Sequence, residues 1–272
     1  MHSGMPRMAD QEYLRAEQYV NAANLNARIQ LHARFSTNQY GWHRWLFDQL
    51  CLPAQCDILE LGCGPGDLWL QNVPRIAPGW RITLSDFSAG MLGQAVANLR
   101  GQGHPFVFSL IDAQSIPFAD RSFDVVIANH MLYHVPDRSR ALAEMRRVIR
   151  PAGRFYASTV GQSHLRELWG LMSQVAPGVA SRATDVTNPF TLESGYDELG
   201  EWFSDVSVAR YSDALVVTEA EPLLAYVWSG EASSMSPEQR EAFARCVERQ
   251  LALHGAIRIS KDSGLFEGVR AA

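Results

Sequence analysis

One short glycine-rich stretch constrains the fold of this 272-residue chain more than any other feature. An apolar run over residues 56–61 carries an acid, Glu60, just before its end. Three glycines then recur at every second position: Gly62, Gly64 and Gly66. A segment able to form a helix begins directly afterwards, at Asp67. This pattern predicts a strand, a tight turn and a helix start, where glycine lets the backbone approach a ligand and the helix N–H groups face it.

Strand-like and helix-like segments alternate from this motif to residue 160. The expected strands are residues 56–61, 81–85, 106–111, 123–128 and 154–159. The expected helices are residues 67–76, 88–100 and 138–149. Such alternation predicts an α/β fold with right-handed crossovers between parallel strands. We therefore expect a Rossmann-like, mostly parallel sheet of seven strands, whose last strand, residues 257–269, runs antiparallel to its neighbours.

The flanking segments follow a different pattern. Helical spacing of apolar residues indicates helices over residues 10–22, 24–36, 41–51, 162–176, 191–203, 219–228 and 237–254. We also expect a loop over residues 177–190 and strands over 205–210 and 213–218. We expect an N-terminal helical lid of residues 1–50 and a core of residues 51–272, with helical insertions at about 162–190 and 219–254. The aromatic side chains of these segments either close over a ligand or simply pack on the sheet.

Composition argues against several classes of function. The net charge is −5 and no block of basic residues occurs, which argues against a nucleic-acid partner. No apolar run approaches the ~18 residues that a membrane span needs, and residues 1–10 lack a signal core, so we expect a cytoplasmic protein without a membrane partner. The four cysteines form no CxxC pair, which predicts reduced thiols and no metal site.

Acidic and polar residues stand where the expected parallel strands end. They are Glu60, Asp86, Asp112 and the pair Asn129 and His130. Because open parallel sheets bind ligands outside the carboxyl ends of their strands, we expect these groups to converge on one site.

The glycine spacing separates two ligand classes. Dinucleotide sites use GxGxxG, and Asp67 stands where that pattern has its third glycine. An acid at a helix start repels a pyrophosphate, and Glu60 adds further negative charge. A cationic ligand without phosphate fits better, and S-adenosylmethionine combines a sulfonium and an ammonium with ribose and adenine. A nicotinamide-dependent dehydrogenase is therefore disfavoured.

Five segments carry further motifs in chain order. They are residues 58–66 (ILELGCGPG), 84–92 (LSDFSAGML), 112–118 (DAQSIPF), 123–135 (FDVVIANHMLYHV) and 144–154 (EMRRVIRPAGR). With these motifs the chain resembles the class I S-adenosylmethionine-dependent methyltransferases, especially small-molecule enzymes of the ubiquinone/menaquinone-methyltransferase-like kind. The resemblance covers residues 56–160 well and the remainder loosely. It implies methyl transfer to an oxygen, nitrogen or carbon atom of a small molecule.

The resemblance also implies a set of cofactor-binding residues. They are Glu60, Gly62, Gly64, Gly66, Asp86, Phe87, Met91, Asp112, Ala113 and Asn129. The glycines approach the methionine end, Asp86 accepts hydrogen bonds from the ribose, Phe87 packs beside the adenine, and Asp112 contacts the adenine amino group. Structural alternatives stay open: Glu60 could hold the glycine loop, Asp86 could cap the helix that opens at Ser88, and Asp112 could form a turn.

The methyl acceptor is less constrained. Candidate catalytic residues near the fourth strand are His130, Tyr133 and His134, and candidate substrate-binding residues are Tyr19, His32, Trp42, His164 and Trp169. A general base helps only where the acceptor has a proton to lose. The aromatic residues favour an apolar or planar acceptor, handled by a monomer or a homodimer. The alternative is a fold relative that binds the cofactor without methylating, either another kind of enzyme or a sensing module.

Overall fold

The structure is a computed structural model that describes residues 23–179, 190–230 and 235–271. The expected helix over residues 10–22 and the candidate Tyr19 lie outside the described residues, as does most of the expected loop over 177–190. No helix within the described ranges has the length and apolar content needed to cross a membrane.

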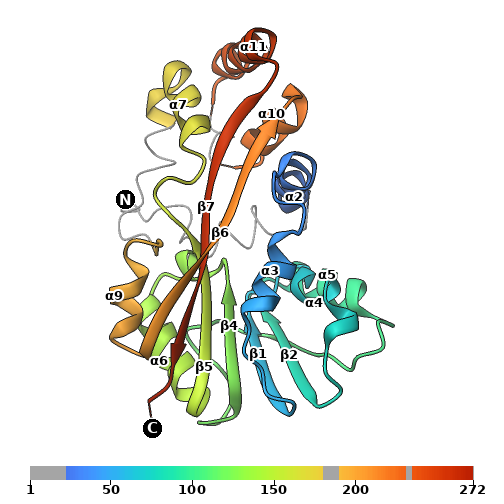
Figure 1. Ribbon diagram of the computed structural model, residues 1–272, viewed down its shortest axis with the longest axis vertical. Helices are drawn as coiled ribbons and strands as arrows, with labels where there is room; N and C mark the ends of the chain where they lie inside the picture. The colour runs from blue at the N-terminus through green and yellow to red at the C-terminus, as the bar shows by residue number, and fades with distance from the viewer. Residues whose placement is uncertain (1–22, 180–189, 231–234, 272) are drawn as a thin grey trace.

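A seven-stranded sheet organises the fold (Figure 1). In spatial order the strands are β3 (Val107–Leu110), β2 (Trp80–Asp86), β1 (Cys56–Leu61), β4 (Phe123–Asn129), β5 (Ile149–Val160), β7 (Ile257–Val269) and β6 (Ser204–Val217). Strands β1 to β5 pair in parallel, and β7 runs antiparallel to both β5 and β6. The expected Rossmann-like sheet with an antiparallel last strand is therefore confirmed.

Both faces of the parallel strands are buried. On β4, Val126 and Ala128 belong to a core shared with helices α6 (Arg138–Val148) and α9 (Gly195–Gly200), whereas Val125 and Ile127 belong to the opposite core. That opposite core includes residues of α3 (Trp42–Gln49), α4 (Asp67–Leu70) and α5 (Ala89–Leu99). The alternation follows from the two-residue period of a strand, and it holds the carboxyl ends of the strands at a fixed edge.

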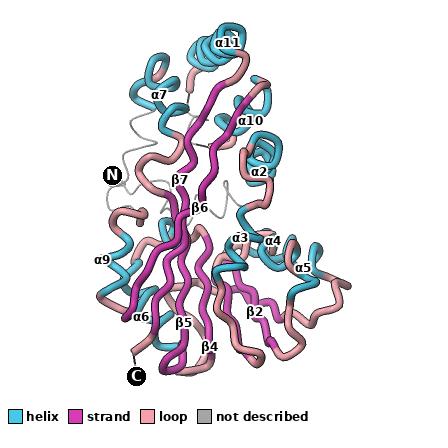
Figure 2. The backbone as a smooth tube through the Cα atoms, in the orientation of Figure 1, coloured by secondary structure: helices cyan, strands magenta, loops and turns pink. Residues whose placement is uncertain are grey.

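Strands β6 and β7 extend beyond the rest of the sheet as a two-stranded ribbon (Figure 2). Residues 263–269 of β7 pair with β5, but residues 257–262 pair only with residues 212–217 of β6. Helices α2 (Ala23–Phe35), α7 (Arg166–Val175), α10 (Ala220–Trp228) and α11 (Pro237–His254) surround this extension (Figure 1). They form a separate hydrophobic core with it.

The bounds of some expected elements need correction. The strands expected over 205–210 and 213–218 are one strand, β6, because β7 pairs with it continuously from Ser207 to Val217. The helix expected over 67–76 stops at Leu70, and a short 3₁₀ turn, Val73–Arg75, follows. Pro74 explains this early end, since it has no N–H to donate to an α-helical carbonyl.

Candidate functional site

A cavity of about 1070 Å³ opens at the carboxyl ends of the parallel strands. The loops after β1, β2, β3 and β4 line one part of it, and residues from α2, α3, α10, β6 and β7 line the remainder. The ligand-binding edge expected for a parallel sheet is therefore enclosed by segments that lie far apart in the sequence.

The three glycines of the first turn have distinct structural roles. All have positive φ, +68° at Gly62, +53° at Gly64 and +83° at Gly66, which disfavours any residue with a Cβ. A Cβ at Gly62 would lie 2.7 Å from the Cβ of Met131, and one at Gly66 would lie 2.8 Å from Cδ1 of Leu99. A Cβ at Gly64 would meet no atom of the described residues within 4 Å. Gly62 and Gly64 line the cavity, whereas Gly66 is required by packing against α5 and is absent from the lining.

This packing predicts a strong effect of Gly62→Ala on folding. The new methyl group clashes with Met131 and strains the backbone, so the free energy of unfolding should fall by roughly 2 kcal/mol. Gly93→Ala is the matched control, because Gly93 lies on α5 with ordinary helical backbone and open space around it, and alanine should stabilise that helix slightly. Urea unfolding of both variants measures the difference, and equal midpoints would contradict the clash.

Asp86 and Asp112 occupy the ends of neighbouring strands and line the cavity. Asp86 is buried, and its carboxylate accepts hydrogen bonds from the N–H groups of Gly64 at 2.9 Å and Ser88 at 2.8 Å. Burial raises the pKa of Asp86, and these backbone bonds oppose that rise. The side chain of Ser88, not that of Asp86, caps α5 by accepting from the N–H of Met91. Phe87, Met91 and Ala113 line the same part of the cavity.

Glu60 lies beneath the glycine turn and is not part of the cavity lining. It is 1% exposed, and its Oε2 accepts a hydrogen bond of 2.6 Å from the indole N–H of Trp69 on α4. Burial, with the nearby charges of Asp86 and Asp67, raises the pKa of Glu60 to about 8, although the Trp69 bond opposes the rise. This geometry fits the alternative in which Glu60 holds the turn rather than the ligand.

A hydrogen-bond network fixes the end of β4 beside the cavity. Oδ1 of Asn129 accepts from the Ser158 hydroxyl at 2.6 Å and from the Trp42 indole at 3.2 Å, and the Ser158 Oγ accepts from the N–H of His130 at 2.9 Å. His130 has a φ of +52°, an uncommon conformation that this network supports. Its ring lies 4.9 Å from that of Trp42, and burial lowers the pKa of His130 to about 3.

Most of the other candidate residues surround the same cavity. His32, Trp42, Tyr133, His134 and His164 line it. Trp169 does not line it. Its side chain packs instead against the hydrophobic core around the ribbon, which also contains the preceding residue on α7, Leu168. Nδ1 of His164 accepts a hydrogen bond from the N–H of Asp262 at 3.2 Å, and burial lowers the pKa of His164 to about 3.

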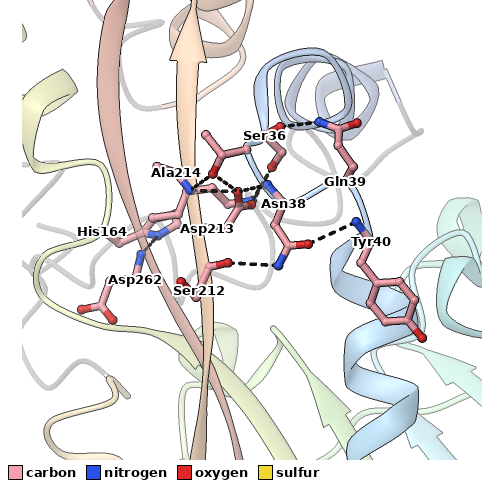
Figure 3. A network of polar contacts seen from close by, with 11 residues as sticks. Ser36, Asn38, Gln39, Tyr40, His164, Ser212, Asp213, Ala214 and Asp262 are labelled. Carbon is pink, nitrogen blue, oxygen red and sulfur yellow. Dashed lines mark hydrogen bonds and ion pairs between the residues drawn. The ribbon is translucent and has the colours of Figure 1, made fainter.

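Several lining residues from distant segments escaped the sequence analysis. They are Tyr211 on β6, Lys261 on β7 and Ser36 after α2, and all three line the cavity. Asp213 lies behind them and joins the segment after α2 to β6 through a polar network (Figure 3). The only sequence signal was the charge of Lys261 within a mostly apolar strand, since pairing between β6 and β7 is not visible from local patterns.

Part of the chain is similar to known proteins. Residues 59–157 match the model of a family described as a methyltransferase domain. The chain is 35% identical over 118 residues to a demethylmenaquinone methyltransferase of Lactobacillus johnsonii, covering 43% of this chain and 48% of that protein. It is also 35% identical over 115 residues to the ubiquinone/menaquinone biosynthesis C-methyltransferase UbiE of Hahella chejuensis, covering 42% and 46%. The chain thus spans about half the length of the curated relatives it matches.

The fold also resembles solved structures over almost its whole length. One is Haemonchus contortus phosphoethanolamine N-methyltransferase 2 in complex with S-adenosyl-L-methionine, with a TM-score of 0.58 and 18% identity. The match covers 99% of this chain and 61% of that chain. At this identity the likeness establishes the fold alone.

Proposed function

We propose that this chain is a class I S-adenosylmethionine-dependent methyltransferase that transfers a methyl group to a small metabolite. The observation that carries the proposal is the convergence of Gly64, Asp86 and Asp112 on one cavity at the ends of three neighbouring strands. When bound, S-adenosylmethionine supplies an electrophilic methyl group on a positively charged sulfur.

The residues at this end of the cavity suit that cofactor. Three carboxylates line it, those of Asp67, Asp86 and Asp112, which favours a cation over a phosphate. The carboxylate of Asp86 accepts hydrogen bonds from the backbone N–H groups of Gly64, Ser88 and Phe87, and of its about four lone pairs one stays available for a ribose hydroxyl. The open space at Gly64 admits a ligand where any side chain would stand in its way.

The order of the strands divides the cavity into two ends. Asp67 begins the helix after β1, and Asp86 and Asp112 stand at the ends of β2 and β3. At the other end, Asn129 and His130 end β4, and Tyr211 and Lys261 lie on β6 and β7. We assign the first end to the cofactor and the second to the methyl acceptor. The rings of Trp42 and Tyr211, 5.4 Å apart, suit a planar acceptor, as do the quinone-related names of the relatives in the comparison. Residues 36 and 38–44 of the expected lid line this cavity and would shield both ligands from water.

Binding and product release test this function together. Isothermal calorimetry with S-adenosylhomocysteine should show saturable binding, and incubation with S-adenosylmethionine and a panel of phenols, amines and quinols should release S-adenosylhomocysteine. Binding without release from any acceptor, or from cell extracts, would favour the non-methylating alternative. Absence of binding would contradict the proposal.

Within this function we assign His130 the role of proton acceptor. Its low pKa keeps the imidazole uncharged, and it lies where the two ends of the cavity meet. With an acceptor from the panel that loses a proton, His130→Asn should lower kcat about a hundredfold and leave S-adenosylhomocysteine affinity unchanged. Because the pKa is about 3, wild-type kcat should not fall between pH 8 and pH 5, where an ordinary histidine becomes protonated.

His254→Asn provides the matched control, since His254 is exposed at the end of α11, and it should retain full activity. Full activity in the His130 variant would mean that His134 or Tyr133 accepts the proton, or that no general base is used.

A further inference from the structure

Lys261 is the only lysine among the 24 lysine and arginine residues of the chain. It lies on β7, in the ribbon beyond the end of β5, and its side chain is only 10% exposed. It lines the acceptor end of the cavity, where its Nζ lies 5.7 Å from the centre of the Tyr211 ring. All other lysine or arginine positions of the chain are arginines, and the one lysine side chain is buried beside the expected methyl acceptor.

The ammonium group is positioned by the network behind it. Lys261 Nζ donates to Oδ2 of Asp213 at 2.5 Å and to Oγ of Ser36 at 3.1 Å. The Asp213 side chain is fully buried and also accepts from Ser36, Thr37, Asn38 and Ala214, which spreads its negative charge over many donors (Figure 3). An ammonium has three N–H groups, and within the described residues only two of them have a hydrogen-bond acceptor.

The surroundings of Lys261 differ from those at the cofactor end. Arg44 is the only other lysine or arginine that lines the cavity in the described part of the chain, and it is exposed on α3. The neighbouring His130 and His164 are uncharged at neutral pH, because burial lowers the pKa of each to about 3. Nδ1 of His164 accepts from Asp262, so the neutral ring carries its proton on Nε2 and can serve as a second donor. The cavity thus has carboxylates at one end and N–H donors at the other.

We propose that Lys261 is a specificity-determining residue that binds an anionic oxygen on a planar methyl acceptor, either a carboxylate or a phenolate-type oxygen. This inference rests on the proposed function. The third N–H of Lys261 forms a charge-assisted hydrogen bond to that oxygen while the aromatic rings of Trp42 and Tyr211 contact the planar part. A neutral acceptor of the same shape leaves one N–H of the buried ammonium without a hydrogen-bond acceptor. A binding site discriminates strongly between two ligands when one of them leaves a buried polar group unpaired in this way.

A single lysine makes the test direct. Protein labelled with ¹³C at lysine Cε and saturated with S-adenosylhomocysteine gives one side-chain lysine resonance, which is then titrated at pH 8 with two matched pairs. The carboxylate arm compares 2-naphthoate with neutral 2-naphthamide, and the phenolate arm compares 4-nitrophenolate with neutral 4-nitroanisole. At least one anion should shift the resonance saturably and bind at least about tenfold more tightly than its neutral partner. The arm that responds identifies the oxygen. Neutral probes that bind equally well, or a resonance that no anion shifts, would overturn the proposal.

Variants separate recognition from stability. Lys261→Met combined with Asp213→Asn removes the ammonium without leaving a buried carboxylate unpaired, and calorimetry should show the preference for anions lost while S-adenosylhomocysteine affinity persists. Asp213→Asn alone keeps the ammonium and should keep the preference. A double variant that still prefers anions would overturn the role of Lys261, whereas loss of S-adenosylhomocysteine binding by the wild type would overturn the proposed function instead. Thermal unfolding verifies that both variants are folded.

Discussion

Asp86→Ala is expected to weaken S-adenosylhomocysteine binding by about a hundredfold. A ribose hydroxyl can donate a hydrogen bond to this carboxylate, and a hydrogen bond to a charged group contributes about 1.5–3 kcal/mol, a range that includes the ~2.7 kcal/mol corresponding to a hundredfold change. The variant also loses the acceptors for the N–H groups of Gly64 and Ser88, which hold the turn in place. Calorimetry with S-adenosylhomocysteine measures the effect.

Ser88→Ala is the control that separates ligand binding from helix capping. It removes the side-chain oxygen that caps α5, which should lower the free energy of unfolding by about 1 kcal/mol, but it leaves the carboxylate of Asp86 in place. Its affinity for S-adenosylhomocysteine should stay within a few-fold of the wild type. Asp86→Ala with wild-type affinity would show that Asp86 serves only the local backbone, the structural alternative raised by the sequence.

The contrast between the two ends of the cavity explains what the sequence could predict. The cofactor end is built from residues that directly follow strands, so the alternation of strands and helices and the rule for parallel sheets placed Asp86 and Asp112 together. The acceptor end depends on pairing between β6 and β7, which brings Lys261 beside Asp213 from 48 residues away. No local periodicity encodes that register, and the polar residues within the two strands looked like interruptions.

The helix boundaries show a similar contrast between what the local sequence could and could not predict. The α6 and α11 boundaries were predictable because Asp137 and Ser236 are N-caps with side-chain bonds to the third following N–H. The helix expected over 191–203 is reduced to α9, Gly195–Gly200, because Thr191 and Ser194 exchange hydrogen bonds in the first part of the segment. Side-chain bonds of this kind compete with helix formation and are not apparent from apolar spacing alone.

Glu60→Gln is expected to make the protein less sensitive to alkaline pH. Burial raises the pKa of Glu60 to about 8 from the ordinary value of 4.5, so the folded state binds more protons than the unfolded state between these values. Stability from this group is therefore complete below pH 4.5 and declines as the pH rises to 8, by up to about 1.4 kcal/mol per pH unit. Glutamine does not titrate and keeps an oxygen that can accept the indole N–H of Trp69. The variant should gain stability relative to the wild type as the pH rises.

Urea unfolding at pH 5, 6.5 and 8 measures this gain as a difference between the two proteins at each pH. The two proteins are compared at equal pH because other groups also change stability with pH. The pKa values of His130 and His164 are lowered in the fold, so these residues destabilise it as the pH falls below 6.5. This contribution is the same in both proteins and cancels in the difference. Glu248→Gln, on the exposed surface of α11, should follow the wild type at every pH. Parallel curves for Glu60→Gln and wild type would mean that Glu60 is already ionised in the fold. Its charge would then contribute to the negative potential that favours a cationic ligand at the glycine turn, instead of being held as a neutral acid beneath it.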